Sequence, residues 1–214
     1  MPTPKYDCIV VGAGPAGVTA AAVLGRRGLS VLLLEAAVYP GAENWSGAVY
    51  FTEVLEDEAV FGAAAIASAP YERRVTRRGL FATDGGLALG ATVRDEVAFR
   101  SSYTVLRPLY DRYLAEKARE HGVTLVAETT VTSLVRERGR VIGVHTERGP
   151  AYADVVFLAE GDASHLVTQE GYERPDVARP TFLQGVKEVV RLGRERIEER
   201  FGLGPEEGAA YEFL

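Results

Sequence analysis

The sequence predicts an α/β fold, in which a Rossmann-like domain with a parallel sheet is joined to part of an antiparallel domain. Two short, wholly apolar runs, residues 8–11 and 31–34, flank a glycine-rich turn and an alanine-rich helical segment. Such runs are typical of parallel strands that are buried on both faces. Between residues 71 and 99, alternating side chains and a glycine turn indicate antiparallel strands instead.

The glycine-rich turn GAGPAG follows the first apolar run directly. Gly12 permits the tight turn, Gly14 lets the backbone approach a pyrophosphate, and Gly17 lets the helix pack close to the strand. Pro15 and Ala16 open the helix, whose first N–H groups attract phosphate. An ordinary glycine-rich turn is the simpler alternative. However, the strand, turn, helix and second strand lie within about 30 residues, and together they predict a dinucleotide-binding site.

Glu35 follows the second apolar run, about 20 residues after the glycines. From there its carboxylate can accept hydrogen bonds from an adenosine ribose, and it would repel a 2′-phosphate. These residues therefore predict an adenine dinucleotide as ligand, with FAD and NAD as alternatives.

The composition excludes several classes of function. The chain of 214 residues is 47% hydrophobic and 25% charged with a net charge of −6, which gives no indication of nucleic-acid binding. Cys8 is the only cysteine, so an internal disulfide and a cysteine-ligated iron–sulfur cluster are excluded. We expect a cytoplasmic protein, because there is no signal-peptide core and no apolar run of membrane-spanning length. No His, Cys or carboxylate pair indicates acid–base catalysis, so no catalytic residue and no metal site are predicted.

A long irregular segment, residues 36–50, leaves the carboxyl end of the second strand. Ligands bind at this edge of open α/β sheets, and loops of this length are usually functional or mobile. A surface connection with an incidental Trp45 is the alternative. We expect a short helix over residues 51–61, with Thr52 as its N-cap.

The middle of the chain predicts a hairpin and then a helix. Residues 75–81 and 87–89 form the hairpin, and the arginines at 73–74 and 77–78 indicate a solvated strand face rather than an anion site. A strand over residues 101–106 follows.

An amphipathic helix is expected over residues 108–120. Arg107 lies just before its N-terminus, where a cation helps to hold phosphate. His121 lies at its C-terminus, where it can complement the helix dipole.

The remaining elements complete the two sheets. We expect strands at residues 123–126, 131–135, 141–146 and 152–158, a strand over 181–192, a helix over 194–201, and no closing element at 211–214. The strand ending at residue 158 delivers Glu160 and Gly161 to the ligand-binding edge.

Several segments carry a resemblance to a known family. They are VVGAGPAG at 10–17 with Glu35, GAENWSGAVY at 41–50, SYTVLRPLYDRYLAEKA at 102–118, VVFLAEGDASHL at 155–166 and GVKEVVRL at 185–192. The chain resembles the FixC and electron-transfer-flavoprotein–ubiquinone oxidoreductase family, which is related to the geranylgeranyl reductases and has the glutathione-reductase-2 type of fold. The resemblance covers nearly the whole chain but only the N-terminal half of the family's length.

The resemblance implies FAD as the cofactor and assigns residues to it. The glycine turn would hold the pyrophosphate, and Glu35 with Ala36 the adenosine ribose. Arg107 would reach the phosphates and the backbone of Val131 the adenine. The loop approaching the flavin ring would contain Asn44, Ser46 and Gly47, and Glu160 with Gly161 would lie near the pyrophosphate.

The resemblance also implies a domain division and a function. The FAD-binding domain would comprise residues 1–70 and 100–180, and a partial antiparallel substrate domain 71–99 and 181–214. Electrons would pass from a reduced electron-transfer flavoprotein, or a similar redox protein, toward quinone, with a ferredoxin-like subunit as a further partner and a peripheral position at the inner membrane.

Other hypotheses about the function remain open. They are a geranylgeranyl-type reductase acting on a prenyl lipid, a truncated non-catalytic FAD-binding module and, more weakly, an aromatic hydroxylase. An unpaired edge of the antiparallel sheet would favour association with a second copy or a partner chain.

Overall fold

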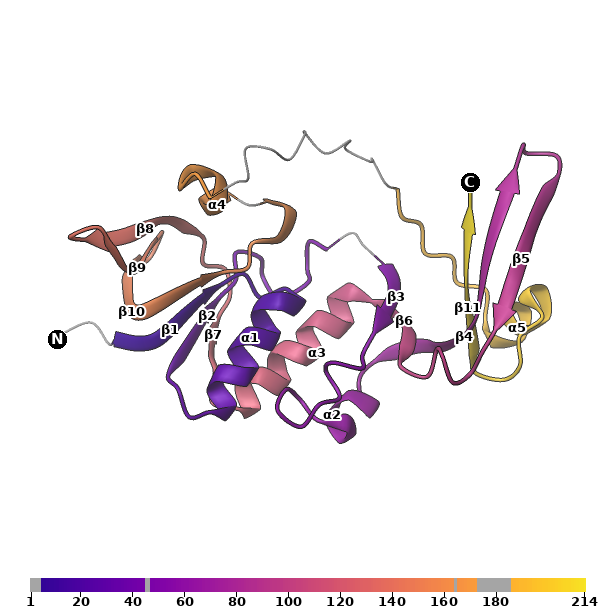
Figure 1. Ribbon diagram of the computed structural model, residues 1–214, viewed down its shortest axis with the longest axis horizontal. Coiled ribbons are helices and arrows are strands. Elements are labelled where there is room, and N and C mark those ends of the chain that lie inside the picture. Colours follow the sequence, from indigo (N-terminus) through magenta and orange to yellow (C-terminus); the bar gives the residue numbers. More distant parts are fainter. Residues whose placement is uncertain (1–4, 45–46, 164, 173–185) are drawn as a thin grey trace. The chain divides into compact units, whose positions relative to one another are not determined.

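The computed structural model describes residues 5–44, 47–163, 165–172 and 186–214 (Figure 1). Trp45 and Ser46 lie outside these ranges, as do residues 173–185. The chain forms two compact units. The first comprises Met1–Asn44, Leu55–Ala69 and Arg107–Gly185, and the second comprises Trp45–Val54, Pro70–Leu106 and Val186–Leu214.

A six-stranded sheet forms the first unit, in the order β7-β2-β1-β10-β9-β8. Its strands are β1 (Lys5–Val11), β2 (Val31–Leu34), β7 (Thr124–Val126), β8 (Val131–Glu137), β9 (Arg140–Thr146) and β10 (Gly149–Leu158). The four strands β7, β2, β1 and β10 run parallel, and β9 and β8 add an antiparallel hairpin at the edge. The expected parallel sheet, the return over residues 123–126 and the hairpin are confirmed.

Strand β2 and the last four residues of β1 are buried, whereas Val155 and Phe157 of β10 are exposed. Helices α1 (Pro15–Arg26) and α3 (Arg107–Glu120) pack together beside β1, β2 and β7 (Figure 1). On the sheet's other side, Ile9 and Val11 of β1 form an apolar cluster with residues of β2, β8, β9, β10 and the short helix α4 (His165–Gln169). This two-sided burial explains why β1 and β2 read as wholly apolar runs.

The second sheet has the order β11-β4-β6-β3, with β5 also paired to β4. Its strands are β3 (Gly47–Phe51), β4 (Tyr71–Thr83), β5 (Ala88–Arg94), β6 (Ser102–Leu106) and β11 (Glu207–Phe213). The expected hairpin is confirmed as β4 and β5. The expected boundaries assigned β3 and β6 to the first domain, whereas these two strands pair with each other and β6 pairs with β4.

Two expectations around residue 50 were wrong. The irregular segment ends before β3, whose residues pair with β6 in the register Val49↔Thr104. No helix begins at Phe51. Thr52 is fully buried, and both its backbone N–H and its hydroxyl donate to the Ser101 carbonyl oxygen, at 2.8 and 3.2 Å. The nearest helix is α2 (Ala63–Ala67), so long-range pairing overrides the local helical pattern here.

Two expectations near the C-terminus were also wrong. Residues 186–192 have no regular structure, although a strand was expected there; residues 181–185 of that strand lie outside the described ranges. The closing strand β11, which was not expected, pairs in parallel with β4. It follows helix α5 (Arg194–Phe201), which the sequence does predict.

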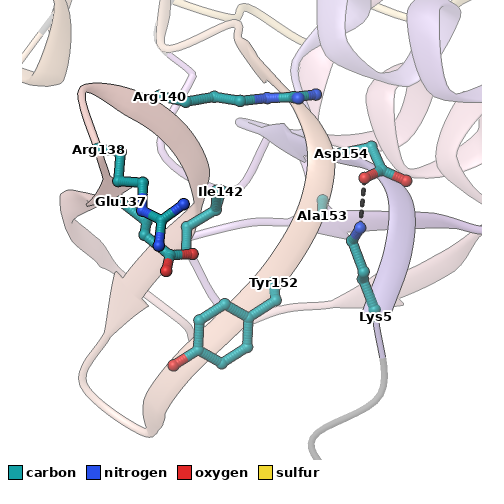
Figure 2. A pocket seen from close by; sticks show the side chains of 8 residues that line it. All are labelled: Lys5, Glu137, Arg138, Arg140, Ile142, Tyr152, Ala153 and Asp154. Carbon is teal, nitrogen blue, oxygen red and sulfur yellow. Dashed lines mark hydrogen bonds and ion pairs between the residues drawn. The ribbon is translucent and has the colours of Figure 1, made fainter.

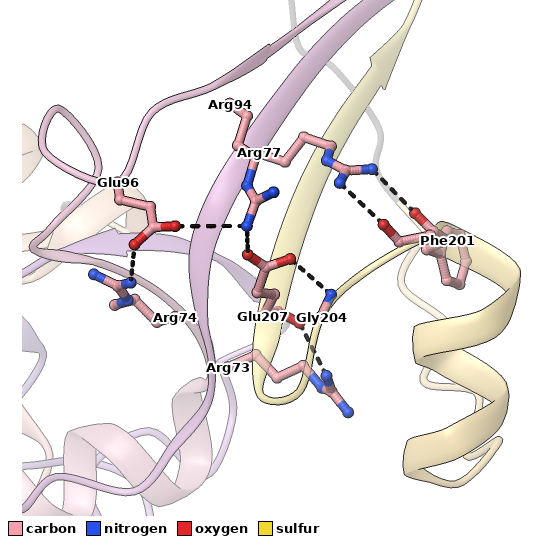
Figure 3. Close-up of polar contacts among 9 residues, drawn as sticks. Arg73, Arg74, Arg77, Arg94, Glu96, Phe201, Gly204 and Glu207 are labelled. Atoms are coloured by element: carbon pink, nitrogen blue, oxygen red, sulfur yellow. Dashed lines mark hydrogen bonds and ion pairs between the residues drawn. The ribbon is translucent and has the colours of Figure 1, made fainter.

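The arginines of β4 hold this C-terminal segment (Figure 3). Arg73 donates to the carboxylate of Glu198 at 3.1 Å and to the backbone oxygen of Glu207 at 2.9 Å. Arg77 donates to the carbonyl oxygens at the end of α5, and Arg94 of β5 forms an ion pair with the Glu207 carboxylate. The expectation of a solvated face was wrong for Arg73, whose side chain is only 13% exposed.

Candidate functional site

Three parallel strands end side by side in the first sheet. Val11, the last residue of β1, pairs with Leu34 of β2 and with Leu158 of β10. The N–H of Gly12 donates to the Leu34 oxygen and that of Ala159 donates to the Val11 oxygen, both at 2.8 Å. The glycine turn, Glu35 and the Ala159–Glu160 turn therefore meet at one edge of the sheet, where open α/β proteins bind ligands.

The glycines of the turn have different surroundings. Gly12 has a φ of +98°, and a Cβ there would lie 2.4 Å from the oxygen of Ala159. A Cβ on Gly17 would lie 1.9 Å from the oxygen of Gly12, so the start of α1 touches the turn. Gly14 has no atom within 4 Å of its Cβ position. Gly12 and Gly17 are needed for packing, whereas Gly14 leaves the open approach that a pyrophosphate needs.

The N-terminus of α1 is suited to bind an anion. Gly14 is the N-cap and provides no side-chain hydrogen bond, Pro15 occupies the first turn, and the first turn contains no acidic residue. The unpaired N–H groups and the positive end of the helix dipole therefore face the open side of the turn.

The carboxylate of Glu35 contacts the glycine turn. Oε2 accepts the backbone N–H of Ala13 at 2.8 Å, and Oε1 accepts that of Ala37 at 2.9 Å. Each oxygen retains a second lone pair for a ribose hydroxyl. Ala36 is exposed beside it. Glu35 thus lies against the glycine turn and ties the end of β2 to it.

Arg107 lies against the loop that follows β2. Gly41 has a φ of +86°, and its Cβ position is 2.8 Å from the Arg107 oxygen and from the Asp111 Cβ. The guanidinium of Arg107 forms a bidentate pair with Asp111, at 2.7 Å for both bonds, and the Asp111 side chain is buried. The structure therefore brings Arg107 and the start of the 41–44 loop together, with the arginine already held by a carboxylate.

The other predicted site residues are more dispersed. Asn44 donates its N–H to the Gly41 oxygen at 3.1 Å, Gly47 begins β3, and Ser46 lies outside the described ranges. Val131 is buried at the start of β8, opposite Thr146.

Glu160 and Gly161 follow the end of β10. Gly161 has a φ of +66° and opens a 3₁₀ turn. The Glu160 carboxylate accepts backbone N–H groups at the start of α4, a role that the sequence pattern did not indicate.

An open pocket lies at the opposite end of β1 (Figure 2). Its lining includes Lys5 at the start of β1 and Asp154 of β10, which form an exposed ion pair. Lys5 is about 20 Å from the carboxyl end of β1 at the usual rise per strand residue. This pocket is therefore separate from the edge described above.

Other reactive groups give no competing site. Burial raises the pKa of the Cys8 thiol, which keeps it protonated and unreactive. The part of the chain that the structure describes contains no cluster of three or more His, Cys, Asp or Glu residues able to hold a metal ion. No helix within the described ranges is long and apolar enough to cross a membrane.

Comparison with known proteins decides the family. Residues 7–164 match the family of FAD dependent oxidoreductases. The chain belongs to this family. It is 40% identical over 97% of its length to the Protein FixC of Azorhizobium caulinodans, of which it covers 48%. It is 39% identical over its whole length to the probable electron transfer flavoprotein-quinone oxidoreductase YdiS of Escherichia coli, of which it covers 49%. These matches confirm the resemblance, and the chain spans about half the length of these relatives.

Solved structures confirm the fold of this FAD-dependent oxidoreductase. A geranylgeranyl bacteriochlorophyll reductase-like protein from Thermoplasma acidophilum superposes with a TM-score of 0.63 at 23% identity, over 78% of this chain and 42% of that one. The flavin-dependent brominase Bmp2 gives a TM-score of 0.60 at 20% identity, over 78% and 41%. The family match gives FAD as the cofactor, as the resemblance implied. The space beside Gly14, between the tightly packed Gly12 and Gly17, fits such a ligand.

Proposed function

We propose that this chain binds FAD at the shared carboxyl edge of β1, β2 and β10 and takes part in FixC-type electron transfer. In that reaction, electrons pass from a reduced carrier flavoprotein to FAD and on toward quinone. The observation that carries the proposal is the N-terminus of α1. Its N-cap, Gly14, provides no side-chain hydrogen bond and has open space at its Cβ position, whereas Gly12 and Gly17 have no room for a Cβ.

The proposed roles of the residues follow from their positions. Gly14, Pro15, Ala16 and the first N–H groups of α1 bind the pyrophosphate, and Glu35 with Ala36 binds the adenosine ribose. The remaining contacts are Val131 with the adenine, Arg107 with the phosphates, Gly161 with the pyrophosphate, and Asn44, Ser46 and Gly47 with the flavin side. FAD itself supplies the redox chemistry when bound, and the protein supplies placement and electrostatics.

The ion pair with Asp111 fixes the position from which Arg107 would contact a phosphate. The two bonds to Asp111 come from Nε and one terminal nitrogen of the guanidinium, so the neighbouring carboxylate sets the orientation of the arginine. The buried carboxylate holds the side chain in a fixed position, which reduces the entropy lost on binding.

The proposed partners are those that the relatives' names suggest. They are an electron-transfer flavoprotein as donor and a quinone as acceptor. The resemblance adds a ferredoxin-like subunit as a further proposed partner. We place this reaction on the cytoplasmic side, at the surface of the inner membrane. The exposed edge of β5 supports association with a second copy or a partner chain, since every residue of that strand is exposed.

The test has two stages. The purified chain is mixed with FAD, freed of excess, and examined for bound flavin absorbance. Reduced electron-transfer flavoprotein is then added without oxygen, and the loss of the bound flavin's absorbance is followed. Bound FAD that becomes reduced supports the full proposal. Bound FAD that stays oxidised leaves only the non-catalytic FAD-binding module, and a folded chain that takes up no FAD contradicts both.

A further inference from the structure

The carboxylate of Glu160 is hydrogen-bonded within the protein. Its Oε1 and Oε2 accept the backbone N–H of Leu166 at 3.0 and 3.1 Å, and Oε2 also accepts that of Val167 at 3.1 Å. These are backbone groups at the start of α4, which would otherwise have no partner in the helix. Glu160 therefore caps a helix that begins five residues later in the chain.

This cap joins the turn after β10 to the core. Leu166 is fully buried in the apolar cluster that contains Ile9, Val11 and Leu34. Ala159, the residue before Glu160, donates its N–H to the Val11 oxygen at 2.8 Å. The 159–160 turn is thus held on one side by β1 and on the other by α4.

The turn packs directly on the glycines of the cofactor site. The oxygen of Ala159 is 2.4 Å from the Cβ position of Gly12, and the Ala159 side chain is 3.2 Å from that of Gly17. A shift of the 159–160 turn by a few tenths of an ångström therefore changes the space around both glycines. The glycine turn thus packs against a strand end that lies about 140 residues later in the sequence.

We propose that Glu160 is a positioning residue, which fixes the glycine turn through Ala159 by capping α4 and which does not itself bind the pyrophosphate. A free carboxylate beside a phosphate would repel it, whereas this carboxylate is occupied by backbone donors. The proposal rests on FAD binding at this edge and differs from the family-based expectation, in which Glu160 lies at the pyrophosphate as a ligand.

Two variants distinguish the effect of side-chain length from the effect of charge at Glu160. Glu160→Gln removes the charge but keeps an oxygen where Oε2 accepts both N–H groups. Glu160→Asp keeps the charge but is one methylene shorter, so it loses the cap. We expect the Kd for FAD to rise about tenfold in Glu160→Asp and to stay within about threefold in Glu160→Gln, in line with the usual effect of losing a helix cap. The reverse order overturns the proposal, because charge would then be what matters. Binding by Glu160→Gln that is tighter by more than about threefold also overturns it, because the charge would then be acting on the phosphate directly.

A matched control separates positioning from general stability. Val144→Ala removes two methyl groups from the same apolar cluster, from β9, without touching the turn. It lowers stability to denaturant and leaves the Kd for FAD unchanged. If Val144→Ala weakens FAD binding as much as Glu160→Asp does, the role of Glu160 is stability alone and the proposal is wrong.

A second measurement does not depend on FAD. Amide hydrogen exchange in the unliganded chain reports the N–H groups of Leu166, Val167, Ala159 and Gly12 separately. Glu160→Asp is expected to speed exchange at all of these positions, and Val144→Ala at none of them selectively. Faster exchange confined to Leu166 and Val167 contradicts the proposal even if the wild-type chain fails to bind FAD, so failure of the inference and failure of the proposed function are distinguishable.

Discussion

Strands β1 and β5 both contain seven residues, but their surroundings are opposite. The last four residues of β1 are buried, whereas every residue of β5 is exposed. β1 has a hydrogen-bonded neighbour on each side and packing on both faces, while within the described ranges β5 pairs with β4 alone. The comparison shows that position in the sheet, rather than apolar content, determines how much of each strand is buried.

The difference extends to what holds each unit together. The first unit is stabilised by apolar packing around the parallel strands, which keeps the carboxyl edge in place for the cofactor. The C-terminal strand of the second unit is held through arginine contacts to Glu207 and to the end of α5 (Figure 3). Arg73 also contacts the Glu198 carboxylate. We therefore expect the first unit to respond mainly to cavities and the second to pH and salt.

The same side-chain truncation in each unit gives the largest contrast. Leu33 of β2 is fully buried, whereas Leu89 of β5 is 78% exposed. We expect Leu33→Ala to lower the free energy of unfolding by about 2–5 kcal/mol, because it leaves a cavity. Leu89→Ala should change it by no more than about 0.5 kcal/mol. Urea denaturation followed by circular dichroism measures both, and equal effects would contradict the comparison.

Two glycine substitutions extend the comparison of crowded and open positions to the cofactor site. Gly17→Ala places a Cβ 1.9 Å from the Gly12 oxygen, so α1 must shift, with an expected loss of about 1–3 kcal/mol of stability and loss of FAD binding. Gly14→Ala has free space, so it should keep the stability of the wild type but weaken FAD binding by obstructing the pyrophosphate. Thermal unfolding and flavin titration of each variant check this. Equal FAD affinity in Gly14→Ala and the wild type would remove the open glycine from the site.

Glu207 should make the second unit sensitive to acid. The Gly204 N–H bound to this carboxylate at 2.7 Å, together with Arg94, lowers its pKa below the usual 4.5. A lowered pKa contributes stability above the ordinary value, and that stability is lost as the pH falls through the folded-state pKa. The protection of the β11 amides against hydrogen exchange, corrected for the pH dependence of the intrinsic exchange rate, should therefore fall in acid, and Glu207→Gln should remove most of this dependence. Glu212→Gln, which changes a more exposed partner of Arg78, is the control and should leave it in place.

The smallest expected effect is the pH dependence that His121 gives to the stability of the first unit. Burial and the nearby Arg26 lower the pKa of its ring below 6.5. Between the folded-state pKa and 6.5 the unfolded chain binds the proton more readily, so stability increases with pH across this window and is complete above it. His121→Gln should flatten that part of the stability profile, measured by urea denaturation at several pH values. An unchanged slope would assign the dependence to another group.

The sequence predicted the first unit well, because its signals are local. Wholly apolar runs mark β1 and β2, and the glycines report close contacts that only a residue without Cβ can make. The spacing from the turn to Glu35 likewise depends on one strand–helix–strand unit. In the candidate site, the glycine turn and Glu35 lie together as the pattern predicts.

The errors lie where pairing is long-range. Residues 51–61 have a helical pattern, yet Thr52 is bound to Ser101, about 50 positions away along the chain. Residues 186–192 are apolar enough for a strand, but a strand also needs a neighbour. The cap formed by Glu160 was missed because it depends on where the later helix α4 begins, which no local pattern fixes.

A flavin titration of the purified chain, with Gly14→Ala as the paired variant, tests the cofactor site directly. The wild-type chain is expected to take up one FAD per chain, with flavin absorbance that remains after gel filtration. The variant, equally stable to urea, is expected to bind FAD more weakly. A folded wild-type chain that elutes colourless after incubation with FAD would contradict the central claim that this edge of the sheet forms the cofactor site.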